Sequence, residues 1–338
     1  MSAFAARLER ATRVVPRPRG VWGFILRRIL LGLLTLFFVS IVVFAATQAL
    51  PGDAARAFLG RNATPQSLAA LREQLHLNEP VLSQYFHWLG GFLRGDLGKS
   101  LTGSQEPVTS LIGPRIKNSA FLMLIAAAIS VPLSIALGSV AARRRDRVFD
   151  HATSVVLLVL AALPEFVTAI VLVVLLGTSV FHVLPPVSLI PPNGSPWNYP
   201  KELVLPVLAL VLAVTPYIAR IMRASMIEVL ESDYVEMARL KGMREQTVLW
   251  RHALPNGIAP AIQVIALSLA YLAGGIVVVE FVFAYPGIGS AFVGAVSNRD
   301  LPTVQALGIL IAAAYVVLNV AADVATILVS PRLRTSLR

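Results

Sequence analysis

Cysteine is absent from the 338 residues, and charged residues make up only 14% of them. Without cysteine, disulfide bonds, thiolate metal sites and cysteine nucleophiles are excluded together. The low share of charge, with an apolar fraction of 56% and a mean hydropathy of +0.73, also argues against a soluble globular enzyme. The lipid bilayer is therefore the solvent in which the sequence has to be interpreted.

Motifs of catalysis and of nucleotide binding are missing as well. We find no metalloprotease histidine pair, carboxylate dyad or Ser-His-Asp arrangement, and the histidines are scattered over loops and span ends. The segment GDLGKS, Gly95 to Ser100, resembles part of a phosphate-binding loop, but Leu93 occupies the position of that motif's first glycine. We interpret GDLGKS as a turn, and we expect the chain to bind no metal or cofactor and to catalyse no reaction.

Six charge-poor runs are long enough to cross a bilayer, because a hydrocarbon core about 30 Å thick requires about 20 apolar residues of helix. Continuous runs of this length favour helices over the alternating pattern of a membrane barrel. We therefore predict an all-α integral membrane protein with six transmembrane helices. The predicted spans are Ile29 to Leu50, Ala120 to Ala142, Ala152 to Leu176, Leu203 to Ile221, Ile258 to Val279 and Val304 to Val329.

The distribution of basic residues predicts which side of the membrane each segment faces. With the N-terminus inside, the cytoplasmic segments hold most of the Lys and Arg residues but fewer than half of the acidic ones. This positive-inside asymmetry places both termini in the cytoplasm. The net charge of +11 then has a membrane explanation, and we expect no nucleic acid partner.

The predicted segments follow from these spans. Residues 1–28 form a cytoplasmic extension that leads into an uncleaved anchor. In the outer segment, a Thr-Pro start signal predicts a helix from Thr64 or Pro65 to Leu75, and the later outer stretch LPPVSLIPPNGSPW is predicted to be non-helical. The remaining divisions are the first span at 29–50, the extracytoplasmic segment at 51–119, a five-helix core at 120–330 with a cytoplasmic loop at 225–257, and a cytoplasmic tail at 331–338.

One cytoplasmic segment is strongly charged although it lies between two very apolar runs. It reads ESDYVEMARLKGMREQTVLWRHALPNGI and occupies residues 231–258. No proline or glycine occurs from 225 to 241, and Leu230, Tyr234 and Met237 recur at helical spacing, which predicts an amphipathic helix. Gly242 suits the left-handed residue that closes a helix. A second short helix is predicted from Glu245 to Ala253, stopped by Leu254-Pro255.

The predicted pair of helices joined by a glycine turn has two interpretations. It could lie in the lipid headgroups, where methionine, tyrosine and basic residues are at home. It could instead dock into a groove on another protein, which suits a surface that presents acids and bases together. The mixture of charges favours the second interpretation and predicts a cytoplasmic partner.

YVEMARLKG followed by WRHALPN resembles the EAA loop of the permease subunits of binding-protein-dependent ABC importers. The core of that loop is an acidic residue, two small residues and a glycine, which correspond here to Glu236, Met237, Ala238 and Gly242. Met237 departs from the small-residue pattern, as is common in the peptide-transporter branch. ESDYVEMARLKG together with HALPN is most similar to the dipeptide, oligopeptide and nickel permease family.

Further stretches extend the resemblance over nearly the whole chain. RRILLGLLTLFFVSIVVFAATQALPGD is similar to the family's first span and its exit, and RGDLGKS is similar to its outer segment. VVVEFVFAYPGIGSAFVGAVSNRDLPTVQA is similar to its connection between the last two spans. At Ser330-Pro331-Arg332 an aspartate commonly precedes the proline, and this departure affects only a local contact. The resemblance implies the type I permease fold of ABC importers.

The resemblance also implies partners and a location. The chain would be a multi-pass protein of the bacterial cytoplasmic (inner) membrane, and a second homologous permease subunit would complete the pathway through the lipid bilayer. Two separate ABC ATPase subunits would bind ATP and Mg, and an extracytoplasmic substrate-binding protein would deliver substrate. The loop would couple to an ATPase through Tyr234, Glu236, Met237, Ala238, Arg239, Gly242, His252 and Pro255.

Ionisable groups at membrane depth are costly and face a cavity or a partner. Glu165 follows Pro164 in the third predicted span, and it is assigned either to the substrate path or to a contact with the partner permease. Glu280 is expected at the solvated outer mouth, also on the possible path. Asp323 lies near the inner end of its span, where we expect a structural ion pair.

Peptides are the expected substrate because they dominate the family, but similar permeases carry nickel complexes, glutathione, opines and oligosaccharides. A self-sufficient channel or secondary carrier is the principal alternative class, although such proteins commonly show more intramembrane acids or recognisable repeats. A membrane scaffold without transport is a further alternative.

Overall fold

The computed structural model describes residues 21–49, 64–74, 78–102, 106–191 and 194–329. Within these residues no strand occurs, and the one isolated β-bridge pairs Lys99 with Pro107. The predicted all-α fold is confirmed. The physical reason is that a helix satisfies its backbone hydrogen bonds within one segment, as the hydrocarbon core requires.

Five apolar helices in the described residues are long enough to cross a membrane, and each overlaps one of the predicted spans. Prolines at 114, 132, 206, 216 and 260 lie inside three of them without ending the helix. The five helices are α2 (Val21–Ala49), α6 (Val108–Arg143), α9 (Pro200–Leu230), α12 (Leu254–Val282) and α14 (Leu301–Val329).

The third predicted span is not one straight helix. It is divided into α7 (Val148–Ala162) and α8 (Glu165–Leu172), which continues as a π-helical turn, η2 (Val173–Thr178), and the two parts meet at an angle of 108°. Leu163 adopts an extended conformation with ψ of 130°, because the ring of a following proline disfavours the helical region. The prediction of a continuous helix from Ala152 to Leu176 is therefore wrong.

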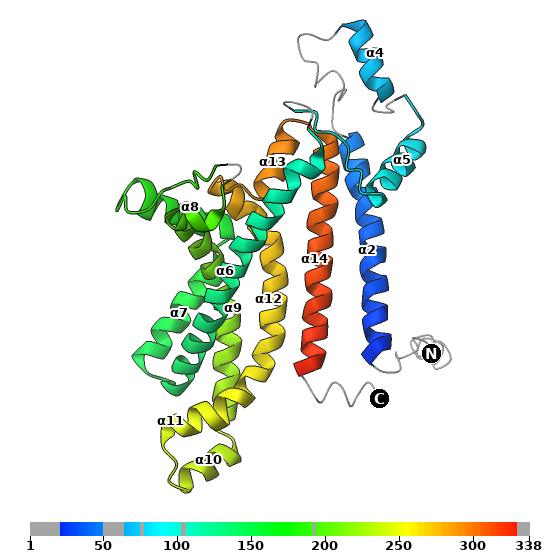
Figure 1. The fold of residues 1–338 in the computed structure, drawn as a ribbon. Helices are drawn as coiled ribbons and strands as arrows, with labels where there is room; N and C mark the ends of the chain where they lie inside the picture. Colours follow the sequence, from blue (N-terminus) through cyan, green and yellow to red (C-terminus); the bar gives the residue numbers. More distant parts are fainter. Residues whose placement is uncertain (1–20, 50–63, 75–77, 103–105, 192–193, 330–338) are drawn as a thin grey trace, which may run out of the picture.

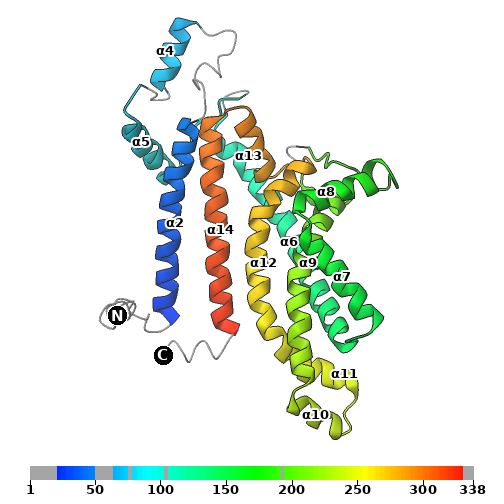
Figure 2. The same cartoon turned by 180° about the vertical axis from the view of Figure 1, so that it is seen from behind.

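The helices form a row that is easiest to follow in Figure 1, where α2 and α14 stand side by side, α12 comes next, and α6, α9 and α7 lie beyond it. The view from behind shows the same order reversed (Figure 2). One end of the row carries α10 (Asp233–Leu240) and α11 (Glu245–Thr247), and we call it the loop end. At the opposite end lie α4 (Pro65–Gln74), α5 (Val81–Leu93) and α13 (Ile288–Ser297).

The core is built around α9, whose Leu210, Val214 and Ile218 are fully buried. Its most extensive contact is with α6. The two backbones approach closely at Gly138, where an added Cβ would lie 2.6 Å from the carbonyl oxygen of Ala219. A glycine at this position is what allows the two helices to pack against each other.

The predicted outer helix is confirmed as α4, which ends at Gln74, while Leu75 lies outside the described residues. The second helix of this segment, α5, was not predicted. It lies along α2, where the Tyr85 hydroxyl is 2.8 Å from Ser40 Oγ and the Gln48 amide donates to Gln84 Oε1 at 2.7 Å. The described residues of the proline-rich stretch, 184–191 and 194–197, are non-helical as predicted, apart from one 3₁₀ turn, η3 (Pro196–Asn198).

GDLGKS forms a turn, as predicted. Gly95 and Gly98 have φ values of +83° and +78°, which favour glycine. The following residues are held by the buried Asp300 carboxylate, which accepts hydrogen bonds from Ser100 Oγ at 2.5 Å and from the Leu101 amide at 3.0 Å. Asp300 also accepts from Thr303 Oγ1 at the start of α14, so the turn joins the outer segment to that helix.

Helices α2 and α14, the two neighbours at one side of the row, are joined near the loop end by an ion pair. The Arg28 guanidinium lies 3.0 Å from the Asp323 carboxylate. The structural pairing predicted for Asp323 is confirmed.

The close approach of α6 and α9 predicts a test of the packing. A Gly138→Val substitution forces atoms against the α9 backbone, and such overpacking costs about 1–3 kcal/mol. We expect a lower melting temperature for the detergent-solubilised protein, measured by intrinsic fluorescence. Gly113→Val is the matched control, because Gly113 lies on the same helix with no atom near its Cβ position. Equal melting temperatures for the two variants would contradict this packing.

Candidate functional site

The charged helix pair projects from the loop end (Figure 1). Helix α9 ends at Leu230, and α10 begins at Asp233 after Ser232, whose backbone is extended with ψ of 148°. Asp233 and Glu236 in the first turn of α10 interact favourably with the positive end of its dipole. The predicted helix across 225–241 is therefore divided in two, because Ser232 is a residue type that favours the position before a helix.

Gly242 closes α10 as predicted. Its φ is +75°, its amide donates to the Arg239 carbonyl at 2.9 Å, and the Met243 amide donates to the Ala238 carbonyl at 3.3 Å. This is the pair of bonds of a Schellman motif, which requires a left-handed residue at the glycine position. No atom lies within 4 Å of a Cβ added there, so backbone conformation alone selects glycine within this chain.

An ion pair across the glycine holds the two helices together. The Arg239 guanidinium donates two hydrogen bonds to the Glu245 carboxylate, at 2.7 and 3.2 Å, and a third to the Leu230 carbonyl at 3.3 Å. Glu245 raises the pKa of the Arg239 guanidinium above its ordinary value through these bonds. The three segments that end or begin at Leu230, Arg239 and Glu245 are thereby fixed relative to one another.

The helix pair buries one apolar cluster and exposes another. Val235, Ala238 and Val248 are buried, so Ala238 packs within this chain. The stripe predicted from Leu230 through Tyr234 to Met237 does not form, because the break at Ser232 changes the register of the helix. Four large apolar side chains are instead exposed: Tyr234 at 45%, Met237 at 56%, Leu240 at 75% and Trp250 at 68%.

The second half of the pair departs from the prediction at Pro255. After α11 the chain forms a π-helical turn, η4 (Val248–Ala253), and continues into α12 without a stop. Pro255 directly follows this π-helical turn, as the second residue of α12. The predicted stop at Leu254-Pro255 is therefore wrong. His252 lies in the π-helical turn, with its Nε2 atom buried and without a hydrogen-bond partner among the described residues.

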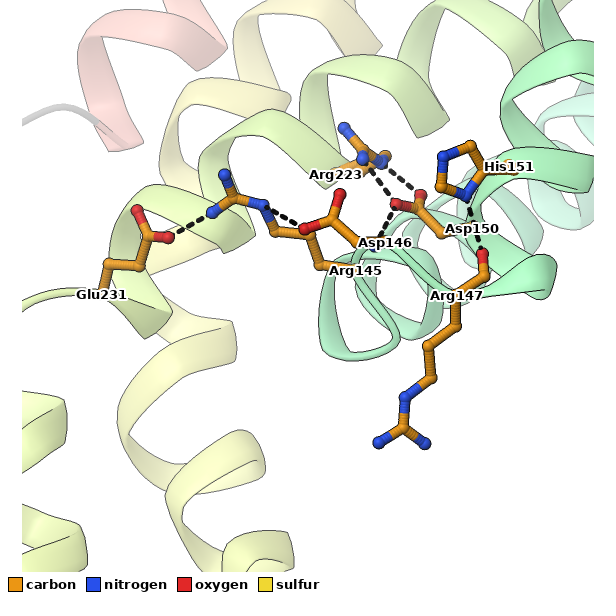
Figure 3. A network of polar contacts seen from close by, with 7 residues as sticks. All are labelled: Arg145, Asp146, Arg147, Asp150, His151, Arg223 and Glu231. Carbon is orange, nitrogen blue, oxygen red and sulfur yellow. Dashed lines mark hydrogen bonds and ion pairs between the residues drawn. The ribbon is translucent and has the colours of Figure 1, made fainter.

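A polar network connects the helix pair to the core (Figure 3). Arg145, in the turn between α6 and α7, forms an ion pair with Glu231 at the end of α9, just before α10 begins. Arg145 also lies 3.6 Å from the Asp146 carboxylate. This pair joins the α6–α7 turn to the residue from which the loop departs.

The buried part of this network is the pair of Asp150 and Arg223. Asp150 on α7 has a side chain that is 3% exposed, and it accepts two hydrogen bonds from the Arg223 guanidinium of α9, at 2.5 and 2.7 Å. Its second oxygen also accepts from the Asp146 amide at 3.1 Å. The bidentate pair holds α7 against α9 close to the loop end, where the helix pair is attached (Figure 3).

The structure places Glu280 differently from the prediction. Glu280 is 0% exposed, so it does not lie at a solvated mouth. Its carboxylate accepts hydrogen bonds from Ser119 Oγ at 2.5 Å and from the Gly289 amide at 2.6 Å, at the start of α13. A Cβ added at Gly287 would overlap this carboxylate, so YPGIGS is the glycine-containing turn that passes over it. Glu280 therefore joins α6, α12 and α13.

Glu165 lies at the start of α8, directly after the break in the third span. Its carboxylate rests on the α12 backbone, because a Cβ added at Gly275 would overlap it. Tyr271 lies four residues before Gly275 on the same face of α12, so its ring is the neighbouring polar side chain of that helix. The two acids assigned to the path thus have separate surroundings, with Glu165 partly exposed and Glu280 enclosed.

Several residues of the site were not predicted. Leu240, Glu245 and Trp250 lie in the quoted segment, but helical spacing alone did not show which of its faces is exposed. Asp150 and Arg223 are 73 positions apart, and no local pattern pairs them. Within the described residues no group of three or more His, Asp or Glu side chains could hold a metal ion.

Comparisons with known proteins agree on one family. Residues 134–335 match the family described as "Binding-protein-dependent transport system inner membrane component", and residues 21–136 match the family of its N-terminal part. The chain is 36% identical over 315 residues to a probable peptide ABC transporter permease, y4tP, of Sinorhizobium fredii, covering 92% of this chain and 99% of the relative. It is 30% identical over 312 residues to the oligopeptide transport system permease AppB of Bacillus subtilis, with the same coverage.

The buried ion pair predicts a large effect of a small change. Asp150→Asn removes the charge that compensates Arg223, whose side chain is 29% exposed, and the loss of hydrogen bonds to a charged group costs about 1.5–3 kcal/mol. We expect a clear loss of thermal stability and faster proteolysis near the α6–α7 turn. Asp146→Asn is the control, because the Asp146 side chain is 80% exposed, and it should change the melting temperature little. A matching loss in both variants would show that the buried pair does not hold α7 in place.

Proposed function

The chain belongs to the family of binding-protein-dependent transport system inner membrane components, and we propose that it is the permease subunit of an ATP-driven peptide importer. The relatives named as peptide permeases cover 92% of the chain, which supports a shared role over its whole length. In the proposed assembly, a second permease completes the pathway and two ABC ATPases bind ATP and Mg. A binding protein outside delivers the peptide. The assembly lies in the bacterial inner membrane, with the loop end facing the cytoplasm.

The observation that carries this proposal is the exposed face of the helix pair. Tyr234, Met237, Leu240 and Trp250 are exposed large apolar side chains on a projecting element, which also exposes charged residues of both signs. A buried apolar centre with a polar rim is the usual anatomy of a protein interface. Lipid headgroups fit less well, because the acidic Glu231, Asp233 and Glu236 would be repelled by an anionic membrane surface.

The contacts of the helix pair support a role in which it moves as a rigid unit and transmits the displacement of a docked ATPase to the transmembrane helices. ATP binding can change the pathway only by favouring one of two arrangements of the permease, so the docked element has to transmit that difference. The Arg239–Glu245 pair fixes the helix pair internally, and the Arg145–Glu231 pair joins it to the α6–α7 turn. The Asp150–Arg223 pair joins that turn to α9. When the ATPases close, the displacement of α10 is passed to α6, α7 and α9 together.

Replacing Gly242 tests the coupling. Valine cannot adopt the left-handed backbone without strain, and the cost of about 1–2 kcal/mol falls on the turn that positions α10. We expect Gly242→Val to remain in the membrane but to lose ATP-dependent peptide uptake in reconstituted liposomes. Gly242→Asn is the matched control, because asparagine tolerates the left-handed region. Normal uptake and normal peptide-stimulated ATPase activity in the valine variant would contradict the coupling role.

Placing a charge on the exposed face tests the docking surface. We expect Leu240→Glu to abolish copurification of the ATPase subunits, because a desolvated carboxylate would oppose an apolar groove. Leu93→Glu is the control, since Leu93 is 77% exposed, nearly the same as Leu240, but lies on α5 at the opposite end. Copurification should survive in the Leu93 variant. If the Leu240 variant also retains the ATPases, the docking surface lies elsewhere.

A further inference from the structure

Glu165 differs from the buried acids Asp150 and Glu280 and from the partly buried Asp323, because its carboxylate has no ion pair and no set of hydrogen-bond donors within the described residues. No Lys, Arg or His of the described residues forms an ion pair with Glu165. Its carboxylate lies against Gly275 of α12, and Tyr271 is one helical turn away on the same face of that helix. A carboxylate at membrane depth is costly unless it faces a cavity or a partner. The other acids have their partners within the chain: Asp150 with Arg223, Asp323 with Arg28, and Glu280 with Ser119 and the α13 backbone.

Three helices bring polar groups to the same depth. Glu165 follows α7, which rises about 22 Å from the loop end at 1.5 Å per residue. Tyr271 lies about 25 Å along α12 from the same end, and Tyr217 lies about 20 Å from the end of α9. Helices α9 and α12, which carry Tyr217 and Tyr271, pack against each other, and both side chains are exposed. The break at Pro164 thus places a carboxylate at about the same depth as two tyrosines, about 20–25 Å from the loop end.

The Glu165 carboxylate is held in place, and the tyrosines near it are accessible from outside the chain. Glu165 cannot withdraw toward α12, because its carboxylate already rests on the backbone at Gly275. Tyr217 and Tyr271 are 46% and 51% exposed in the chain, so the face they form is available to something outside it. A carboxylate and two phenol rings together suit a primary ammonium group, which forms charge-assisted hydrogen bonds with the acid and contacts the ring faces.

We propose that Glu165, Tyr271 and Tyr217 bind the N-terminal ammonium group of a peptide as it passes through the pathway. This inference rests on the proposed function of the chain as a peptide permease. The side chains of peptides differ, whereas a free N-terminal ammonium is common to all unmodified ones, so this group is a suitable handle for a pathway of broad specificity. One carboxylate binds it weakly enough for release, which a transport pathway requires.

The test compares two substrates in the complete complex, reconstituted in liposomes with its binding protein. One is a dipeptide, and the other is its desamino analogue, in which hydrogen replaces the ammonium group; both are supplied at concentrations that saturate the binding protein. We expect Glu165→Gln to lower uptake of the dipeptide about tenfold and to change uptake of the analogue by less than twofold. Glu228→Gln, an exposed acid at the inner end of α9, should leave the ratio of the two rates unchanged.

The outcomes separate this inference from the proposed function. If the wild-type complex takes up no peptide with ATP, the proposed function fails. If the wild type transports but Glu165→Gln slows both substrates equally, the carboxylate serves a contact with the partner permease and the inference is wrong. An unchanged dipeptide rate overturns it as well.

A second measurement does not depend on the glutamine variant. Because the chain has no cysteine, Tyr217→Cys supplies its sole thiol. In the assembled complex we expect a membrane-impermeant cationic thiol reagent to label this position, and the dipeptide to slow labelling at least fivefold more than the desamino analogue does. Absence of labelling, or equal protection by both compounds, would place the site off the pathway.

Discussion

A carboxylate buried in an apolar bundle needs partners, and the three buried carboxylates of the described residues find theirs where helices end, turn or break. Asp150 meets Arg223 at the start of α7, the Glu280 carboxylate near the end of α12 accepts from the start of α13, and Asp300 lies just before α14. Each carboxylate accepts hydrogen bonds from another segment and thereby joins two parts of the bundle. In hydrocarbon this arrangement is favoured, because each unsatisfied polar group costs several kcal/mol. That cost is comparable with the free energy of unfolding of a protein, about 5–15 kcal/mol.

The same constraint explains how the projecting helix pair can act on the bundle. A flexible loop would absorb the displacement of a docked partner, whereas α10 is closed by two backbone bonds around Gly242 and held by the Arg239–Glu245 pair. Glu231, which directly precedes the helix pair, forms an ion pair with Arg145. Arg145 lies next to the Asp150–Arg223 pair, which holds α7 on α9. At the other end of α7, the break at Pro164 presents Glu165. One helix therefore connects the proposed site of energy input with the proposed site of substrate contact.

The helical class, five of the spans, the turn at Gly95–Ser100 and the closing role of Gly242 could be predicted, because hydropathy and glycine conformation are local properties. The break at Pro164 could not, since Pro132, Pro206, Pro216 and Pro260 have the same local chemistry and lie within continuous helices. Tertiary packing decides which proline breaks a span. For the same reason, Glu280 was expected in solvent: its enclosure depends on Ser119, 161 positions away, and not on its neighbours in sequence.

The claim on which this account depends is that the exposed face of α10 contacts an ATPase subunit. Its most direct measurement is photo-cross-linking in cells, with a photoreactive amino acid placed at Met237, which is 56% exposed, or at Val235 on the same helix, which is fully buried. The account predicts an adduct between this chain and an ATPase subunit from position 237 and none from position 235. Cross-linking of position 237 to lipid alone, or of both positions to the ATPase equally, would contradict it.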